Sequence, residues 1–211
     1  MRVYDVAQRS PEWFQARVGK LTASRASDML ATIKTGEAAA RRDLRMQLVC
    51  ERLTGLTQED PYINPVMQRG IDKEADAFAA YEAVTGNLAM PCGFVAHDAL
   101  EVGCSPDGVI GAFEGLLELK CPKTATHVGY LRGGVLPKDY LPQLTCALFV
   151  TGAAWIDFVS FDDRLPAHLQ VFHRRLLRAD ADLAGFELAA RLFLTEVERD
   201  VTSLQEVPCA V

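Results

Sequence analysis

The chain has 211 residues, of which 49% are hydrophobic and 24% are charged, a composition that is ordinary for a globular protein. This length allows one substantial core, no apolar run approaches the ~20 residues of a membrane span, and the N-terminal MRVYDVAQRS lacks the apolar stretch of a signal peptide. The net charge of −6 argues only weakly against a nucleic-acid partner, because a site that holds metal ions must itself carry carboxylates.

Helical patterns dominate the first part of the chain. Ser10 and Pro11 are typical of a helix start, and Gly19 is typical of a helix end. The proline-containing segment 56–66 is expected to be a loop. We expect helices over residues 10–18, 22–30, 37–53 and 68–85.

The pattern changes after Gly86, where short apolar runs alternate with glycine, proline and aspartate and predict three or four strands within 88–119. The later elements are expected to be helices over 124–131 and 138–150, strands over 155–161 and 168–173, and a helix over 179–201. This order predicts one α/β domain over residues 1–211, with a central mixed β-sheet flanked by helices. Its parts are a helical N-terminal part (about 10–86), a strand-rich core (about 88–161) and the C-terminal helix (about 179–201).

The stretch CSPDGVIGAFEGLLELKCP, residues 104–122, holds the most informative spacing. Glu118 and Lys120 lie at the end of an apolar strand, and because alternate side chains of a strand share one face, they point the same way. Gly111 and Gly115 permit a tight hairpin that brings Asp107 beside Glu118. Two carboxylates and an amine are therefore expected to converge on one point.

Such a trio suits the hydrolysis of phosphodiesters. Mg²⁺ is bound through one or two carboxylates together with substrate phosphate, and it activates both the phosphoryl group and a water molecule. A neighbouring lysine can position that water and stabilise the negative charge that develops. A surface ion pair is the alternative for an isolated match, because the D…ExK spacing is common by chance.

Four blocks of the sequence together resemble the PD-(D/E)XK nuclease superfamily and, within it, the lambda-exonuclease-like (YqaJ-type) viral recombinases. The blocks are SPEWFQARVGKLTAS at 10–24, RGIDKEADAFAAYEAVTG at 69–86, GCSPDGV joined to LLELKCP at 103–122, and YLPQLTCALFVTGAAW at 140–155. They follow one another in the order of the family and span most of residues 10–165. The resemblance implies a restriction-endonuclease-like core.

The resemblance also implies roles for residues of the site. Asp107 and Glu118 would be metal ligands, with the backbone carbonyl of Leu119 as a further ligand, and Lys120 would be the catalytic lysine. Two Mg²⁺ ions are implied in each active site, with Mn²⁺ as a substitute. Glu74 matches a helix glutamate that reaches the metal, although alone it would be assigned to a solvated helix face. Gln143 matches a glutamine near the attacking water, and a hydrogen-bonded core glutamine is an equal alternative.

The first block implies a pocket for a 5′-terminal phosphate. Arg17 and Ser24 match the residues that hold it, and arginine offers a planar fork for phosphate. Thr22 is a possible helper or only a helix cap, and Ser105 would face the same pocket. Met67 is either an apolar wedge at the end of the duplex or an ordinary core residue. Trp13 is expected to be a core anchor.

The function implied is a magnesium-dependent 5′-to-3′ exonuclease that releases mononucleotides from one strand of linear duplex DNA. It would leave 3′ overhangs for phage-type recombination, acting as a homotrimer with a single-strand annealing protein. Six cysteines without a CxxC pair fit a reduced, cytoplasmic setting. The resemblance implies a bacterial cell and a phage or prophage origin. An endonuclease and a DNA-binding subunit with an inactive site remain alternatives. An iron–sulfur nuclease is rejected because only Cys209 lies near the C-terminus.

Overall fold

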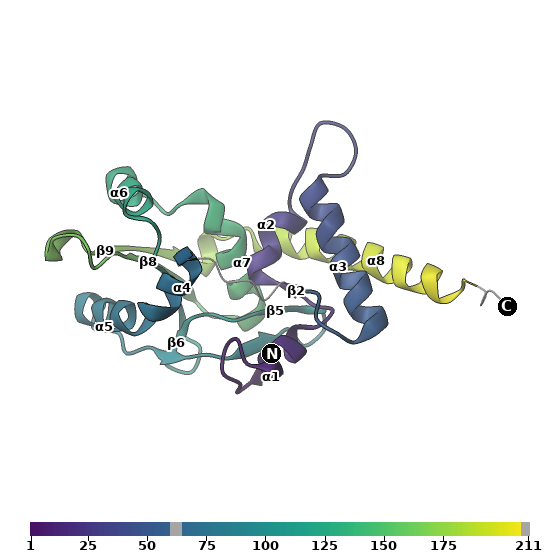
Figure 1. Ribbon diagram of the computed structural model, residues 1–211, viewed down its shortest axis with the longest axis horizontal. Helices are drawn as coiled ribbons and strands as arrows, with labels where there is room; N and C mark the ends of the chain where they lie inside the picture. Colours follow the sequence, from purple (N-terminus) through teal and green to yellow (C-terminus); the bar gives the residue numbers. More distant parts are fainter. Residues whose placement is uncertain (60–64, 208–211) are drawn as a thin grey trace.

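The strands of the protein form two mixed sheets, which are drawn in Figure 1. The computed structural model describes residues 1–59 and 65–207. The first sheet has the order β1-β4-β5-β2, and the second has the order β3-β6-β7-β8-β9. The strands of the first sheet are Arg2–Tyr4 (β1), Phe94–Ala96 (β4), Val102–Cys104 (β5) and Leu21–Thr22 (β2). Those of the second are Met90–Pro91 (β3), Gly108–Ile110 (β6), Gly115–Lys120 (β7), Trp155–Phe161 (β8) and Val171–Leu177 (β9).

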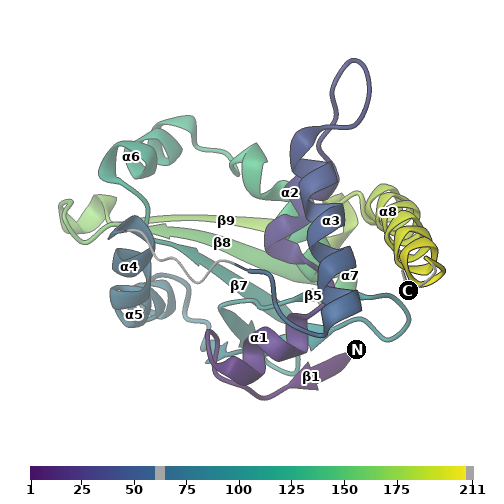
Figure 2. The ribbon, with the colours of Figure 1, turned by 45° about the vertical axis from the view of Figure 1, so that its right-hand side comes forward.

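Helices flank these sheets, as the sequence predicts. They are Pro11–Arg17 (α1), Ala26–Met29 (α2), Ala39–Thr54 (α3), Pro65–Asp72 (α4), Glu74–Thr85 (α5), Thr124–Gly133 (α6), Leu141–Thr151 (α7) and Leu183–Gln205 (α8). Figures 1 and 2 show α3 and α8 side by side at one end of the molecule and α4, α5 and α6 at the other. In the described ranges, no helix combines the length and apolar character that crossing a membrane requires.

Several element bounds differ from the expectation. The helix expected over 68–85 is two helices that meet at Lys73. The strand expected over 168–173 is β9, and the helix expected over 179–201 is α8. Strands β1 and β2 were not expected, because two or three residues are too few to show a period. The loop expected over 56–66 is described only in part: Pro61 lies outside the described residues, as does Cys209, and Pro65 begins α4.

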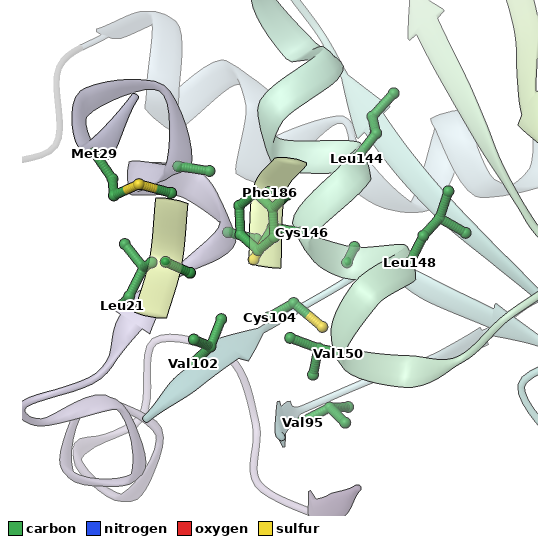
Figure 3. Packing of buried hydrophobic residues seen from close by; sticks show 14 of the residues in the cluster. Leu21, Met29, Val95, Val102, Cys104, Leu144, Cys146, Leu148, Val150 and Phe186 are labelled. Atoms are coloured by element: carbon green, nitrogen blue, oxygen red, sulfur yellow. The ribbon is translucent and has the colours of Figure 1, made fainter. Parts of the chain in front are cut away.

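The main core lies around α7, which is mostly apolar and is buried along most of its length. Figure 3 shows Cys146 and Leu148 of α7 among side chains from β4, β5, α2 and α8. Cys104 of β5 belongs to this cluster and precedes the site described below. The core therefore fixes the position of α7 against the strand that leads into the site.

A buried carboxylate fastens α5 to the second sheet. Asp157 of β8 is fully buried and accepts hydrogen bonds from Arg175 Nε (2.7 Å), Arg175 Nη2 (2.8 Å) and the Tyr81 hydroxyl of α5 (2.9 Å). Burial alone would raise the pKa of Asp157, but the hydrogen bonds from Arg175 and the nearby His173 ring (Nε2–Oδ1 3.0 Å) hold it below its ordinary value. Such a carboxylate stabilises the fold only while its partners remain.

Candidate active site

A β-hairpin places the first carboxylate of the site. Strands β6 and β7 pair antiparallel, with Gly108 opposite Leu117 and Ile110 opposite Gly115. Gly111 adopts a φ of +61° in the turn, a conformation that favours glycine. Asp107 comes directly before β6, so this register sets it opposite Glu118. The tight hairpin expected from the sequence is therefore present.

Strand β7 places the second carboxylate and the amine. Its Leu117 and Leu119 pack into a small cluster with α5, whereas Leu116 packs into the main core. Glu118 and Lys120 share the face of Leu116 and form an ion pair through Glu118 Oε1 and Lys120 Nζ. Glu118 is only 3% exposed, and both residues of the pair line a cavity.

Two further hydrogen bonds join this group. Gln143 Nε2, near the start of α7, donates to Glu118 Oε1 over 2.6 Å. The backbone N–H of Leu119 donates to Asp107 Oδ2 over 2.6 Å. Gln143 is thus a hydrogen-bonded amide that also faces the site. This geometry agrees with both interpretations from the sequence, a glutamine near the attacking water and a hydrogen-bonded core glutamine.

The electrostatics of the site favour a cation. Burial, and after it the neighbouring Glu118 carboxylate, raise the pKa of Asp107 from 3.8 to about 7. Burial alone would lower the pKa of Lys120, but Glu118 and Asp107 raise it above its ordinary value. A divalent cation beside these two carboxylates would offset the repulsion between them.

The donor set fits Mg²⁺, for which one or two carboxylates suffice. Asp107 and Glu118, with the backbone carbonyl of Leu119, are the groups that would hold it. Within residues 1–59 and 65–207, no cluster of three or more His, Cys, Asp or Glu side chains is placed to hold a metal ion. The fit therefore rests on the two carboxylates and on backbone and substrate oxygens.

Three of the four residues expected to bind phosphate line the same cavity, which has a volume of about 160 Å³. Its lining combines Asp107, Glu118, Lys120 and Gln143 with the candidate phosphate ligands Arg17, Ser24 and Ser105. The remaining residues of the lining are Gln8, Trp13, Ala23, Cys104, Pro106 and Ala147. Residues from the first and third sequence blocks thus meet in one place.

Trp13 organises the phosphate side of this cavity. Its indole N–H donates to Ser105 Oγ over 2.8 Å, and the guanidinium of Arg17 lies 3.9 Å from the centre of its ring. Arg17 is only 7% exposed, and its Nε and Nη2 atoms donate to Glu59 Oε1 over 3.1 and 2.7 Å. Trp13 is a buried anchor, as the sequence predicts, and in addition it contacts two candidate phosphate ligands.

Four expected site residues do not line the cavity, and one of them is Leu119, which would contribute only its backbone carbonyl. Glu74 lies in the first turn of α5 and pairs with Arg9 (Nη1–Oε2 3.6 Å), although its charge contributes to the raised pKa of Asp107. Thr22 is buried, and its hydroxyl lies 3.3 Å from that of Ser24. Met67 lies on α4 and is 51% exposed, which excludes the interpretation as an ordinary core residue.

Two residues of the site were missed in the sequence. Gln8 lines the cavity and donates to the carbonyls of Cys92 (2.9 Å) and Pro106 (3.1 Å), which fixes the turn before Asp107. The only indication of this role in the sequence is that Gln8 lies two residues before the first block, 10–24. Glu59 lies 42 residues from Arg17 in the chain, and no spacing indicates that contact.

Comparison with known proteins agrees with these observations. The family model of the YqaJ-like viral recombinase domain matches residues 12–154, more than half of the chain. No curated protein matches the chain significantly.

Among solved structures, an alkaline exonuclease from Laribacter hongkongensis, LHK-Exo, is 40% identical, with a TM-score of 0.83 over 93% of this chain and 96% of that one. The same exonuclease in complex with dAMP is 39% identical, with a TM-score of 0.84 and the same coverage. A phage-related exonuclease from Haemophilus somnus 129PT is 12% identical, has a TM-score of 0.66 over 89% of this chain and 96% of that one, and shares the fold. The chain therefore belongs to the family of YqaJ-like viral recombinases.

Proposed function

We propose that the chain is a magnesium-dependent 5′-to-3′ exonuclease that degrades one strand of linear duplex DNA to mononucleotides. One observation carries this proposal: Asp107, Glu118 and Lys120 line the same small cavity as Arg17, Ser24 and Ser105. A group that suits phosphodiester hydrolysis thus lies beside a group that suits a terminal phosphate. The similarity to exonucleases supports the same class of activity.

The residues of the chain divide the chemistry between them. A bound divalent cation would supply Lewis-acid activation of the phosphate and of water. Lys120, held by Glu118, would stabilise negative charge as it develops on the phosphate. Gln143 would orient the attacking water and leave Glu118 free to act as a ligand through its other oxygen. Each active site would bind two Mg²⁺ ions, for which Mn²⁺ could substitute.

The phosphate side of the cavity would select the end of a strand. A terminal phosphate carries up to one more negative charge than an internal phosphodiester, and the buried guanidinium of Arg17 responds to that difference. Ser24 and Ser105 would add hydroxyl contacts. Each cleavage would create a new 5′-phosphate that can enter the same pocket, so that 3′ overhangs accumulate.

The test compares linear with covalently closed duplex DNA in Mg²⁺, with EDTA as the control. We expect the linear duplex to yield mononucleotides, the closed circle to resist, and EDTA to stop the reaction. Rapid cutting of the closed circle would contradict the exonuclease assignment and indicate an endonuclease with the same metal site. Activity in excess EDTA would overturn the metal-dependent chemistry altogether.

We further propose that the enzyme acts as a homotrimer with a single-strand annealing protein, in the bacterial cytoplasm, during phage-type recombination. The chain would act as one nuclease domain over residues 1–211. Analytical ultracentrifugation at several protein concentrations tests the oligomer, and a monomer at all of them would exclude it.

A further inference from the structure

The guanidinium of Arg17 already has an anionic partner inside the protein. Glu59 follows α3, and its Oε1 atom accepts hydrogen bonds from both Nε and Nη2 of Arg17. The ring of Trp13 stacks on one face of the same guanidinium, with 3.9 Å between Arg17 Cζ and the ring centre. One donor edge of Arg17 is therefore taken by a carboxylate of the same chain.

This contact is built into the fold by a second carboxylate. Glu51 of α3 is 2% exposed, and its Oε2 atom accepts from the N–H of Gly19, just beyond the end of α1 (2.8 Å). Its Oε1 atom accepts from the N–H of Gln58 over 3.0 Å. One buried side chain thus holds both the end of the helix that carries Arg17 and the segment that carries Glu59.

We propose that Glu59 is a displaceable counter-ion of Arg17 that competes with the phosphate of a DNA end or of a 5′-mononucleotide. This inference rests on the proposed function, in which Arg17 binds that phosphate. Glu59 would set how tightly the pocket holds a terminal phosphate. It is a specificity-determining residue that acts through Arg17.

The charges and exposures support an exchange of partners. A buried guanidinium that loses its partner is destabilising, so the empty pocket benefits from an internal carboxylate. Glu59 offers one negative charge, whereas a terminal phosphate offers up to two and three strong acceptor oxygens, so that phosphate can replace it. The side chain of Glu59 is 24% exposed and that of Arg17 only 8%, so Glu59 is the partner that can move into solvent. Its return to Arg17 would favour release of the product nucleotide.

The test is calorimetric binding of dAMP, and of deoxyadenosine, which lacks the phosphate, to the full chain in EDTA. Glu59→Gln should bind dAMP about tenfold more tightly than the wild type, which corresponds to ~1.4 kcal/mol. Deoxyadenosine should bind both proteins equally. Glu187→Gln is the matched control and should behave as the wild type, because Glu187 Oε1 accepts from Nε (2.9 Å) and Nη2 (2.7 Å) of Arg191 in the same geometry on α8.

Arg17→Ala separates the two levels of the proposal. It should weaken dAMP binding, and in its background Glu59→Gln should give no gain. If Arg17→Ala weakens binding but Glu59→Gln binds dAMP as the wild type does, the competition is refuted and the phosphate pocket stands. If Arg17→Ala binds dAMP normally, the phosphate pocket and the competition both fail.

A second variant guards against a folding defect in Glu59→Gln. Glu59→Asp keeps the charge but shortens the side chain, which weakens its contact with Arg17. We expect its gain in dAMP affinity to lie between those of the wild type and Glu59→Gln. Affinity equal to that of the wild type, in a protein with an unchanged thermal unfolding midpoint, would overturn the proposal.

Discussion

The substitution Asp107→Asn tests the electrostatics of the site independently of catalysis. In the metal-free protein, burial and Glu118 raise the pKa of Asp107 from 3.8 to about 7. The folded chain therefore binds this proton more tightly than the unfolded chain does. The stability that results is fully present below pH 3.8 and is lost as the pH rises to about 7. Asparagine cannot ionise, and its carbonyl oxygen can still accept from the N–H of Leu119.

The size of the effect follows from the two pKa values. Their difference corresponds to roughly 4 kcal/mol as an upper limit. Because Asp107 is only half-buried, solvent screens part of this, and we expect ~2 kcal/mol. Asp107→Asn should therefore unfold at a higher urea concentration than the wild type at pH 8.5, and the difference should shrink at pH 5.

The assay is urea unfolding in EDTA at both pH values. Asp43→Asn, the same change at an exposed residue of α3, is the control and should leave stability nearly unchanged. Added Mg²⁺ should stabilise the wild type more than Asp107→Asn, because the wild type keeps both carboxylates. An Asp107→Asn protein that is less stable at pH 8.5 without metal, or a difference that does not vary with pH, would refute this reasoning.

Three further predictions concern catalysis and the fold. Lys120→Ala should lower the cleavage rate more than a hundredfold, which corresponds to ~3 kcal/mol, because the lysine acts on the transition state. Duplex binding, measured by fluorescence anisotropy, should stay largely intact. Near-normal turnover would contradict the role of Lys120. Ca²⁺ should support DNA binding without cleavage, because its larger and looser coordination does not align the attack; turnover in Ca²⁺ equal to that in Mg²⁺ would exclude this. Asp157→Ala should lower the free energy of unfolding by ~1–3 kcal/mol, because the buried Tyr81 hydroxyl loses its acceptor while the partly exposed Arg175 can be solvated, and a urea midpoint unchanged from that of the wild type would show that these contacts are dispensable.

The arrangement of Asp107, Glu118 and Lys120 could be predicted because it depends on local rules. Alternation along one strand fixes the shared face of Glu118 and Lys120, and a short hairpin fixes the place of Asp107. All three lie within nine residues of Gly111. The sequence contains enough information wherever the contact is made within one hairpin.

The rest depends on contacts between distant segments. The pairing of Arg17 with Glu59 requires the packing of α1 against the segment after α3, which no periodic pattern encodes. The break at Lys73 accompanies ion pairs from Lys73 and Arg69 to Asp163 beyond the end of β8, made across about 90 residues. Because these partners lie far apart in the chain, the local helical pattern, which is continuous, does not indicate the break.

The most direct test of the central claim uses a linear duplex that carries a 5′-phosphate on one strand and a 5′-hydroxyl on the other. Each strand bears a different fluorophore at its 3′ end, and degradation in Mg²⁺ is followed by denaturing gel electrophoresis. We predict that the wild type degrades the phosphorylated strand faster, releases mononucleotides and leaves the other strand long, and that Arg17→Ala loses this preference. Equal degradation of both strands by the wild type, or fragments cut from the interior, would contradict the account.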